Sequence, residues 1–220
     1  MTVAARDDKT AALEPRRIPQ SYAEAQGYMR WWDRFYSQPL VSSPELTVKE
    51  LAQFVRRVHP EPGQRMVDVG CGEGGLAAAV GRLGVAVTGY DWSSEAVKLA
   101  KRFKSPFLRF GAHDFSGYIT DVRPAGVEDG SLDIVACRMS LQYLNADEFV
   151  QEVRRWLVPE TGSMYVMLPV VEREPGTKQS GLPEAAIERL REGWAYTERW
   201  YVDAQRIYTA LLLRGPGSSR

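Results

Sequence analysis

The stretch Val67-Asp68-Val69-Gly70-Cys71-Gly72-Glu73-Gly74-Gly75 decides the fold class of this chain. An apolar, β-branched run leads into it and a helical pattern follows it, so we expect a turn from a strand into a helix. Glycine accepts a positive φ and lets a ligand press against the backbone where a Cβ would block it. The first N–H groups of the following helix would suit an anionic group such as a carboxylate. A ligand-binding turn at the carboxyl end of a strand is therefore expected here.

Short apolar runs alternate with helical patterns on both sides of this turn, which predicts a parallel sheet with helices packed against it. The expected strands are Arg65–Gly70, Ala86–Asp91, Phe107–Ala112, Leu132–Met139 and Met164–Pro169, with Thr197–Asp203 and Ile207–Arg214 as a closing antiparallel pair. The fold class is α/β, a doubly wound sheet that is mostly parallel and has an antiparallel C-terminal strand.

Helices are expected between these strands, and residues that favour helix ends mark their limits. The first helix has apolar residues at helical spacing (Leu76, Ala79, Val80 and Leu83) and stops at Gly84. A second begins at Ser93 or Ser94, and Asn145 caps a third. Pro183 and Glu184 begin a short fourth helix.

The region before the first strand predicts a helical cover on the sheet. Aromatic residues crowd into it at Tyr22, Tyr28, Trp31, Trp32, Phe35 and Tyr36, and Pro44–Val58 has the pattern of an amphipathic helix. We therefore expect a disordered lead over residues 1–19, a helical cover or lid over residues 20–60, and a single ligand-binding domain over residues 61–215. The segment Val170–Leu182, rich in charge and in Gly and Pro, is the loop expected to be long and mobile.

Composition limits the classes of partner. The chain has 28 basic and 28 acidic residues, so no surplus of positive charge exists to hold a nucleic acid backbone. No apolar stretch is long enough to span a bilayer, and Met1–Pro19 lacks the apolar core of a signal peptide, so a cytoplasmic protein without a membrane partner is expected. Cys71 and Cys137 are too few for a disulfide framework, and no cluster of cysteine and histidine has the spacing of a metal site.

Carboxylates follow the strands on either side of the glycine-rich turn. Asp91 ends the second strand, 23 positions beyond Asp68, close to the offset of about 20 residues expected for an acid that hydrogen-bonds ribose hydroxyls. The third strand ends at His113 and Asp114, and Asp114 would accept a hydrogen bond from an adenine amine. These acids are expected along one edge of the sheet, as a nucleoside site requires.

The combination Asp68-x-Gly70-x-Gly72-x-Gly74, then Asp91, then Asp114 resembles the class I, Rossmann-like, seven-stranded methyltransferases that use S-adenosylmethionine (SAM) and act on small molecules. The resemblance covers roughly Trp31 to Arg214 and implies that residues 61–215 form the SAM-binding catalytic domain. It places Asp68, Gly70, Cys71, Gly72 and Gly74 around the amino-acid part of SAM and Asp91 at its ribose. Trp92, His113 and Asp114 would lie at the adenine, and Met139 beside the transferable methyl.

The cover and the end of the fourth strand supply the remaining candidates. The segment Trp32-Asp33-Arg34-Phe35-Tyr36 resembles the Trp-Asp-x-x-Tyr segment of small-molecule members, whose aromatic rings close over SAM. Cation–π attraction to a sulfonium gives that arrangement a physical reason, although such rings also serve as ordinary core. The expected cavity residues of the cover are Tyr22, Trp32 and Tyr36, and the candidate substrate contacts are Arg138, Ser140, Gln142 and Tyr143. Arg138 would suit an anionic group, and Tyr143 would be the general base if one is needed.

Alternatives remain at this point. The spacing Gly70-x-Gly72-x-x-Gly75 also satisfies the dinucleotide pattern, but Asp68 inside the strand and the absence of a second domain favour SAM over NAD. The leading hypothesis is SN2 methyl transfer to a small molecule. A SAM-consuming lyase would instead close the aminobutyrate chain to a four-membered cyclic amino acid and release methylthioadenosine. A SAM-binding protein without catalysis is the third hypothesis, and the oligomeric state is left open.

Overall fold

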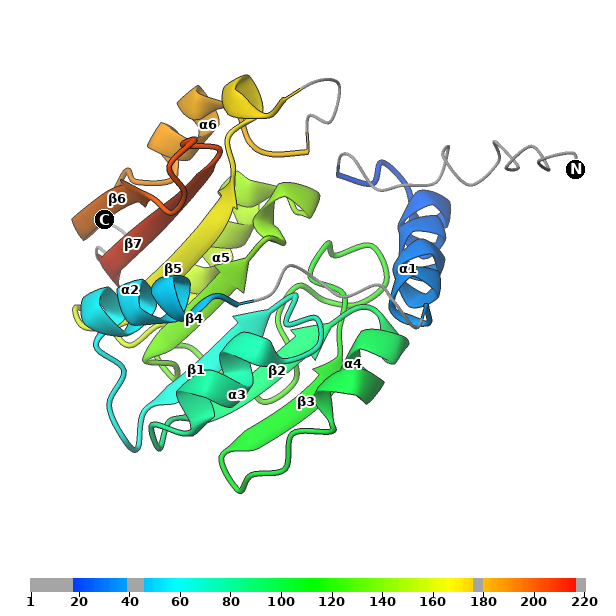
Figure 1. Ribbon diagram of the computed structural model, residues 1–220, viewed down its shortest axis with the longest axis horizontal. Coiled ribbons are helices and arrows are strands. Elements are labelled where there is room, and N and C mark those ends of the chain that lie inside the picture. The colour runs from blue at the N-terminus through cyan, green and yellow to red at the C-terminus, as the bar shows by residue number, and fades with distance from the viewer. Residues whose placement is uncertain (1–17, 39–45, 176–179, 217–220) are drawn as a thin grey trace, which may run out of the picture.

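The computed structural model describes residues 18–38, 46–175 and 180–216, and one seven-stranded sheet runs through them (Figure 1). The strand order is β3-β2-β1-β4-β5-β7-β6. The strands are β1 (Arg65–Val69), β2 (Ala86–Asp91), β3 (Leu108–Ala112), β4 (Ile134–Arg138), β5 (Ser163–Pro169), β6 (Trp194–Tyr201) and β7 (Tyr208–Pro216). Strand β7 pairs antiparallel with both β5 and β6, and the remaining pairs are parallel. The expected mostly parallel sheet with an antiparallel C-terminal strand is confirmed.

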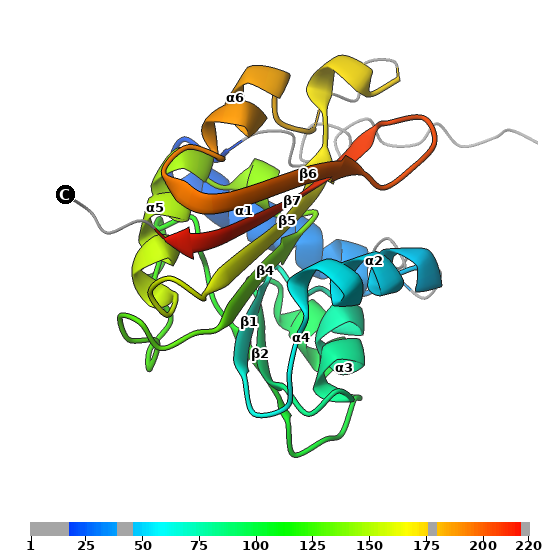
Figure 2. The same ribbon diagram turned by 90° about the vertical axis from the view of Figure 1, so that its left-hand side faces the viewer.

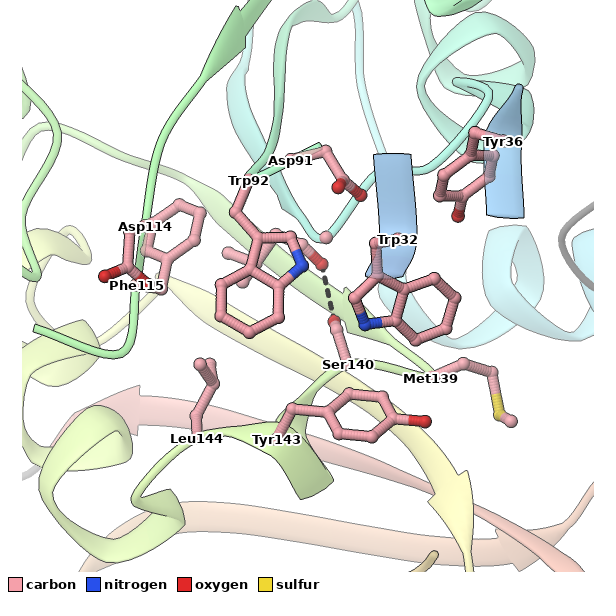
Figure 3. A pocket seen from close by; sticks show the side chains of 12 residues that line it. Trp32, Tyr36, Asp91, Trp92, Asp114, Phe115, Met139, Ser140, Tyr143 and Leu144 are labelled. Atoms are coloured by element: carbon pink, nitrogen blue, oxygen red, sulfur yellow. Dashed lines mark hydrogen bonds between the residues drawn. The ribbon is translucent and has the colours of Figure 1, made fainter. Parts of the chain in front are cut away.

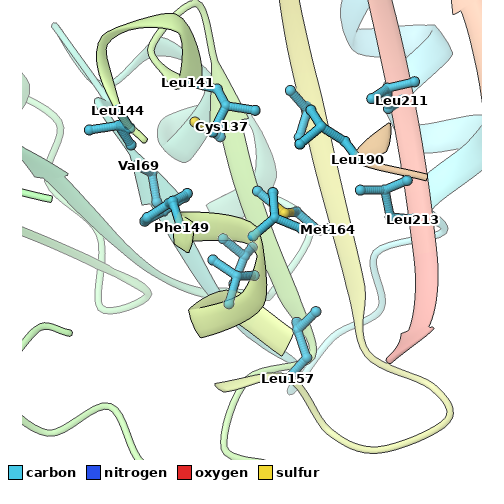
Figure 4. Packing of buried hydrophobic residues seen from close by; sticks show 14 of the residues in the cluster. Val69, Cys137, Leu141, Leu144, Phe149, Leu157, Met164, Leu190, Leu211 and Leu213 are labelled. Carbon is cyan, nitrogen blue, oxygen red and sulfur yellow. The ribbon is translucent and has the colours of Figure 1, made fainter. Parts of the chain in front are cut away.

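Helices cover both faces of the sheet, because side chains alternate between its two sides along each strand (Figure 2). On one side, α5 (Ala146–Trp156) and α6 (Glu184–Arg189) pack on apolar residues such as Cys137, Met164 and Leu211 (Figure 4). On the other side, α2 (Val48–Val58) and α3 (Gly75–Gly81) pack on the alternate residues of the same strands. The central strands are therefore buried on both faces, as parallel sheets require.

Capping residues set where the helices begin. Thr47 and Glu50 form a reciprocal capping box at the start of α2. Ser93 caps α4 (Ser94–Ala100) by accepting a hydrogen bond from the N–H of Ala96, which resolves the choice between Ser93 and Ser94. Asn145 occupies the N-cap position of α5, as expected, but its side chain makes no capping hydrogen bond. The cover helix α1 (Tyr22–Tyr36) begins after Ser21.

Several expected boundaries differ from the structure. The fourth strand is shorter than Leu132–Met139: Leu132 forms an isolated bridge to Leu157, and Met139 ends the ladder because its φ is 61°. Helix α2 begins at Val48, whose side chain is 86% exposed and does not join the buried face. The expected lead up to residue 17, the start of the amphipathic helix at Pro44 and part of the loop Val170–Leu182 lie outside the described residues.

The cover helix α1 lies beside α4, near the carboxyl end of β2 (Figure 1). Short 3₁₀ turns follow β4 at η2 (Leu141–Tyr143) and β5 at η3 (Val171–Arg173). Among the described helices, none combines the length and apolar character needed to cross a lipid bilayer.

Candidate cofactor and active site

Two adjoining cavities lie at the carboxyl ends of β1, β2 and β4, where open α/β sheets bind ligands. The smaller, of about 80 Å³, is lined by Trp32, Tyr36, Val69, Gly70, Asp91, Trp92, Asp114, Phe115, Met139, Ser140, Tyr143 and Leu144 (Figure 3). The larger, of about 490 Å³, reaches along the glycine-rich turn and α3 and includes Asp68, Cys71, Gly72, Glu73 and Arg138. Trp32, Tyr36, Gly70 and Met139 line both, so the two cavities form one elongated cleft.

The glycine-rich turn has the backbone that the sequence predicts. Gly70, Gly72 and Gly74 have φ values of 64°, 52° and 81°, in the region that side chains with a Cβ rarely adopt. The N–H of Cys71 donates to the carbonyl of Tyr90 over 2.9 Å, which ties the turn to β2. At Gly70 and Gly72, which line the cleft, the turn therefore presents backbone to it.

Asp91 connects this turn to the loop after β2. Its Oδ2 accepts a hydrogen bond from the N–H of Gly72, and its Oδ1 accepts one from the N–H of Ser93, each over 2.9 Å. Burial, assisted by the nearby charge of Asp33, raises the pKa of the Asp91 carboxyl from 3.8 to about 6. Each carboxylate oxygen has a second lone pair, so Asp91 can still accept hydrogen bonds from two hydroxyl groups of a ligand in the cavity.

Asp68 is buried on β1 beneath the same turn. Its Oδ2 has no hydrogen-bond partner within the described part of the chain. Burial raises the pKa of this carboxyl from 3.8 to about 7, against the opposing influence of Arg138 and the N–H of Ala77. A buried carboxylate oxygen without a partner is costly, so the larger cavity is suited to a ligand that brings a donor or a positive charge.

The structure separates the two residues expected at the adenine end of β3. Asp114 lines the smaller cavity, although its Oδ1 and Oδ2 accept hydrogen bonds from the N–H groups of Ser116 and Ile119, each over 2.9 Å. His113 does not line either cavity: its Nε2 lies 3.1 Å from the carbonyl oxygen of Val122, and its ring packs against Phe115.

Aromatic rings from three elements form a wall of the cleft. Trp32 and Tyr36 of α1 stack with ring centroids 6.0 Å apart, and Tyr143 of η2 meets Trp32 edge-on at 5.7 Å (Figure 3). Trp92 lines the smaller cavity from the loop after β2. Tyr22 lies elsewhere: it is 53% exposed, lines neither cavity, and its hydroxyl accepts a hydrogen bond from Gln26.

Of the two candidate substrate contacts Arg138 and Gln142, one lines the cleft and the other does not. Arg138 lines the larger cavity and forms a buried ion pair with Glu50 of α2, with Nη2 3.0 Å from Oε1. Burial of Glu50 opposes ionisation, but hydrogen bonds from Thr47 and the charge of Arg138 lower the pKa of that carboxyl. Gln142 lines neither cavity, and its Nε2 donates to the carbonyl of Met139 over 3.0 Å.

Sequence reasoning missed two residues of this region, Glu50 and Phe115, whereas Ser140, a candidate substrate contact, lines the smaller cavity. The pattern Thr47-x-x-Glu50 is typical of a capping box, so a role for Glu50 at a helix start was predictable. Its ion-pair partner Arg138 lies 88 positions further along the chain, and no local pattern indicates that contact. Phe115 follows Asp114 directly and lines the smaller cavity, which no local pattern indicates.

Comparisons with known proteins agree with the fold. Residues 67–165 match a family model described as a methyltransferase domain. A ubiquinone biosynthesis O-methyltransferase of Albidiferax ferrireducens is 30% identical over 151 residues, covering 66% of this chain and 55% of that protein. The chain spans about half the length of the curated relatives it matches.

Two solved structures share the architecture at lower identity. Phosphoethanolamine N-methyltransferase 2 of Haemonchus contortus has a TM-score of 0.68 at 17% identity, covering 89% of this chain and 60% of that one. The [4+2]-cyclase SpnF has a TM-score of 0.63 at 17% identity, covering 92% and 98%. Residues 67–165 thus match a methyltransferase domain, and the fold is that of the class I, Rossmann-like methyltransferases, whose cofactor is SAM.

The residues of the cleft fit this cofactor. SAM carries an ammonium group and a sulfonium, and Oδ2 of Asp68, which has no hydrogen-bond partner among the described residues, lies buried in the wall of the larger cavity. SAM also carries two ribose hydroxyls, and Asp91, which lines the smaller cavity and is bonded to the glycine turn, has acceptor capacity for them. Asp68, the glycine turn, Asp91 and Trp92 would therefore hold it.

Proposed function

We propose that the protein is a SAM-dependent methyltransferase that acts on a small molecule by in-line SN2 transfer. The observation that carries this proposal is the pair of buried carboxylates, Asp68 and Asp91, on either side of the glycine turn in one cleft. When bound there, SAM supplies an electrophilic methyl group on a sulfonium.

The residues of the chain contribute positioning and the exclusion of water. Asp91 accepts the ribose hydroxyls, Asp68 pairs with the ammonium group, and Trp92 and Asp114 border the adenine. The rings of Trp32, Tyr36 and Tyr143 keep water out and stabilise a neighbouring cation by their π faces. Because the methyl group is already activated by its charge, alignment of the acceptor accounts for most of the acceleration.

We further propose that the acceptor is a hydroxyl group. This proposal is supported by the curated relatives of 30% and 34% identity, which are named as O-methyltransferases. A hydroxyl must lose its proton during transfer, and we assign the Oη of Tyr143 to accept it or to hold the hydrogen bond of the nucleophile. Arg138, fixed by Glu50 at the far wall, would orient an anionic group of the substrate.

Fold similarity by itself does not decide the reaction, because SpnF, named as a cyclase, has the same architecture. The test is product analysis by mass spectrometry after incubation of the purified protein with SAM and a panel of small phenols, carboxylates and amines. S-adenosylhomocysteine together with a methylated acceptor supports the proposal. Methylthioadenosine formed from SAM alone would establish the lyase reaction in its place, and tight SAM binding without turnover on any acceptor would favour the non-catalytic reading.

A small molecule is the proposed partner, and the balanced charge of the chain offers no surplus for nucleic acid. A cytoplasmic location is supported by two free cysteines, Cys71 and Cys137, since reducing compartments keep thiols unpaired.

A further inference from the structure

The cover helix α1 is fixed to the loop after β2 by one carboxylate. Oδ1 of Asp33 accepts a hydrogen bond of 2.7 Å from the hydroxyl of Ser93. The same oxygen lies 3.3 Å from the N–H of Glu95 and 3.4 Å from the hydroxyl of Ser94. A negative charge at the first turn of α4 is also favoured by the dipole of that helix.

Ser93, which donates this hydrogen bond, is completely buried and also caps α4. Its Oγ accepts a hydrogen bond of 3.2 Å from the N–H of Ala96, so the hydroxyl is shared between capping α4 and contacting Asp33. A second contact lies one residue earlier, where the ring of Trp92 meets Tyr28 of α1 edge-on at 6.4 Å. Two successive residues of the loop are thus held by α1.

The residue before them is Asp91, the carboxylate between the loop and the glycine turn. Asp91 accepts from the N–H of Ser93 with one oxygen and from the N–H of Gly72 with the other. A continuous series of hydrogen bonds therefore runs from Asp33 through Ser93 and Asp91 to Gly72. The same helix that carries Asp33 also carries Trp32 and Tyr36 into the cleft.

We propose that Asp33 is a positioning residue for the cofactor site, which rests on the proposed function as a SAM enzyme. It docks α1 onto the loop after β2, and by that contact it holds Trp32 and Tyr36 over the cleft and Asp91 at the ribose position. Asp33 lines neither cavity, so it acts through Ser93 and not by touching the cofactor.

The charge of Asp33 gives this role a signature that a purely structural contact lacks. Burial is the main cause of the raised pKa of Asp91, and the carboxylate of Asp33 raises it further by repulsion. The other titratable groups coupled to this site are Asp68 and the thiol of Cys71. Replacing Asp33 by Asn keeps an acceptor for Ser93 but removes the repulsion, so Asp91 should ionise at a lower pH.

The experiment is calorimetric titration of wild type, Asp33→Asn, Asp33→Ala and Arg30→Ala with S-adenosylhomocysteine between roughly pH 5 and pH 8. Arg30→Ala is the matched control, because Arg30 is exposed on the same helix and lines neither cavity. Loss of the contact in Asp33→Ala should weaken binding of S-adenosylhomocysteine roughly 5- to 10-fold at neutral pH. In a steady-state assay of the same variant, the KM for SAM should rise while kcat stays within about twofold of wild type. Asp33→Asn should bind within about threefold of wild type while the acid limb of its pH profile moves to lower pH.

Either of two results would overturn the inference. Asp33→Ala could bind as tightly as wild type, or Asp33→Asn could keep the pH profile of wild type unchanged. If Asp33→Ala fails to fold, as judged by its thermal unfolding, the pH profile of Asp33→Asn decides alone. Wild-type protein that binds neither SAM nor S-adenosylhomocysteine would instead refute the proposed function, so the two failures are distinguishable.

Discussion

Gly70 and Ser140 are in such close contact that a Cβ on Gly70 would overlap the Cβ of Ser140 and lie 2.7 Å from its Oγ. The Oγ of Ser140 donates a hydrogen bond of 2.7 Å to the carbonyl of Val69, so the ends of β1 and β4 are joined directly beneath the cleft (Figure 3). Gly70 is therefore required by its neighbour in the protein as well as by any ligand.

This contact makes a specific prediction about Gly70→Ala. The new Cβ clashes with Ser140 and also occupies a residue with φ of 64°, so we expect destabilisation of roughly 2–4 kcal/mol and loss of SAM binding. The double variant Gly70→Ala/Ser140→Gly removes the clash but not the backbone strain, and should recover part of the stability. Chemical denaturation of the two single variants and the double variant measures this coupling. Additive effects would show that the two residues do not constrain each other.

Asp91→Asn should weaken SAM binding roughly 10- to 100-fold at neutral pH, because a charged acceptor of two ribose hydroxyls is replaced by a neutral one. In the wild type the pKa of Asp91 is raised to about 6, so protonation below that pH should weaken binding. The variant should lack this acid limb. Calorimetry across the pH range checks both effects, and an unchanged acid limb in Asp91→Asn would assign it to another group.

Asp68→Asn should have opposite effects on stability and on binding. Burial raises the pKa of Asp68 to about 7, so the folded protein holds this proton more tightly than the unfolded chain does. Its contribution to stability is therefore lost as the pH rises from about 4 to about 7, at a cost of a few kcal/mol once the group is ionised. The variant without ligand should melt at a higher temperature than wild type at pH 8. Thermal unfolding measures the gain and calorimetry the accompanying loss of SAM affinity; equal melting temperatures at that pH would contradict the assignment.

Trp32→Ala and Tyr22→Ala form a matched pair on the cover helix. Trp32 contacts Tyr36 and Tyr143 in the wall of the cleft, whereas Tyr22 is largely exposed and lines neither cavity. We expect Trp32→Ala to reduce kcat/KM for SAM by roughly 10-fold or more, and Tyr22→Ala to change it by less than about twofold. A comparable loss in both variants would mean that the helix acts through its stability and not through this ring.

The sequence predicted the sheet closely because local patterns mark its strands. Strand β2 was expected at Ala86–Asp91 and is found there, since apolar residues lead into a carboxylate at the strand end. The glycine turn was equally readable, because its conformation is imposed by residues that follow one another. These features depend on near neighbours, which sequence periodicity records.

The parts that escaped prediction depend on contacts between distant segments. Glu50 contacts Arg138 because α2 packs across β4. The two residues are far apart in the sequence, so no local pattern predicts that they meet. His113 was expected at the rim beside Asp114, but its ring turns to the carbonyl of Val122 and packs on Phe115, contacts that no local pattern signals. Gln142 likewise turns back to the carbonyl of Met139 and lines neither cavity, whereas its neighbour Tyr143 lines the smaller one.

The most direct test of methyl transfer is to incubate the purified protein with SAM, with and without small hydroxyl acceptors, and to identify the products by mass spectrometry. Methyl transfer predicts S-adenosylhomocysteine and a methylated acceptor, both dependent on the acceptor and both abolished in Asp91→Ala. Methylthioadenosine produced at the same rate without any acceptor would contradict it.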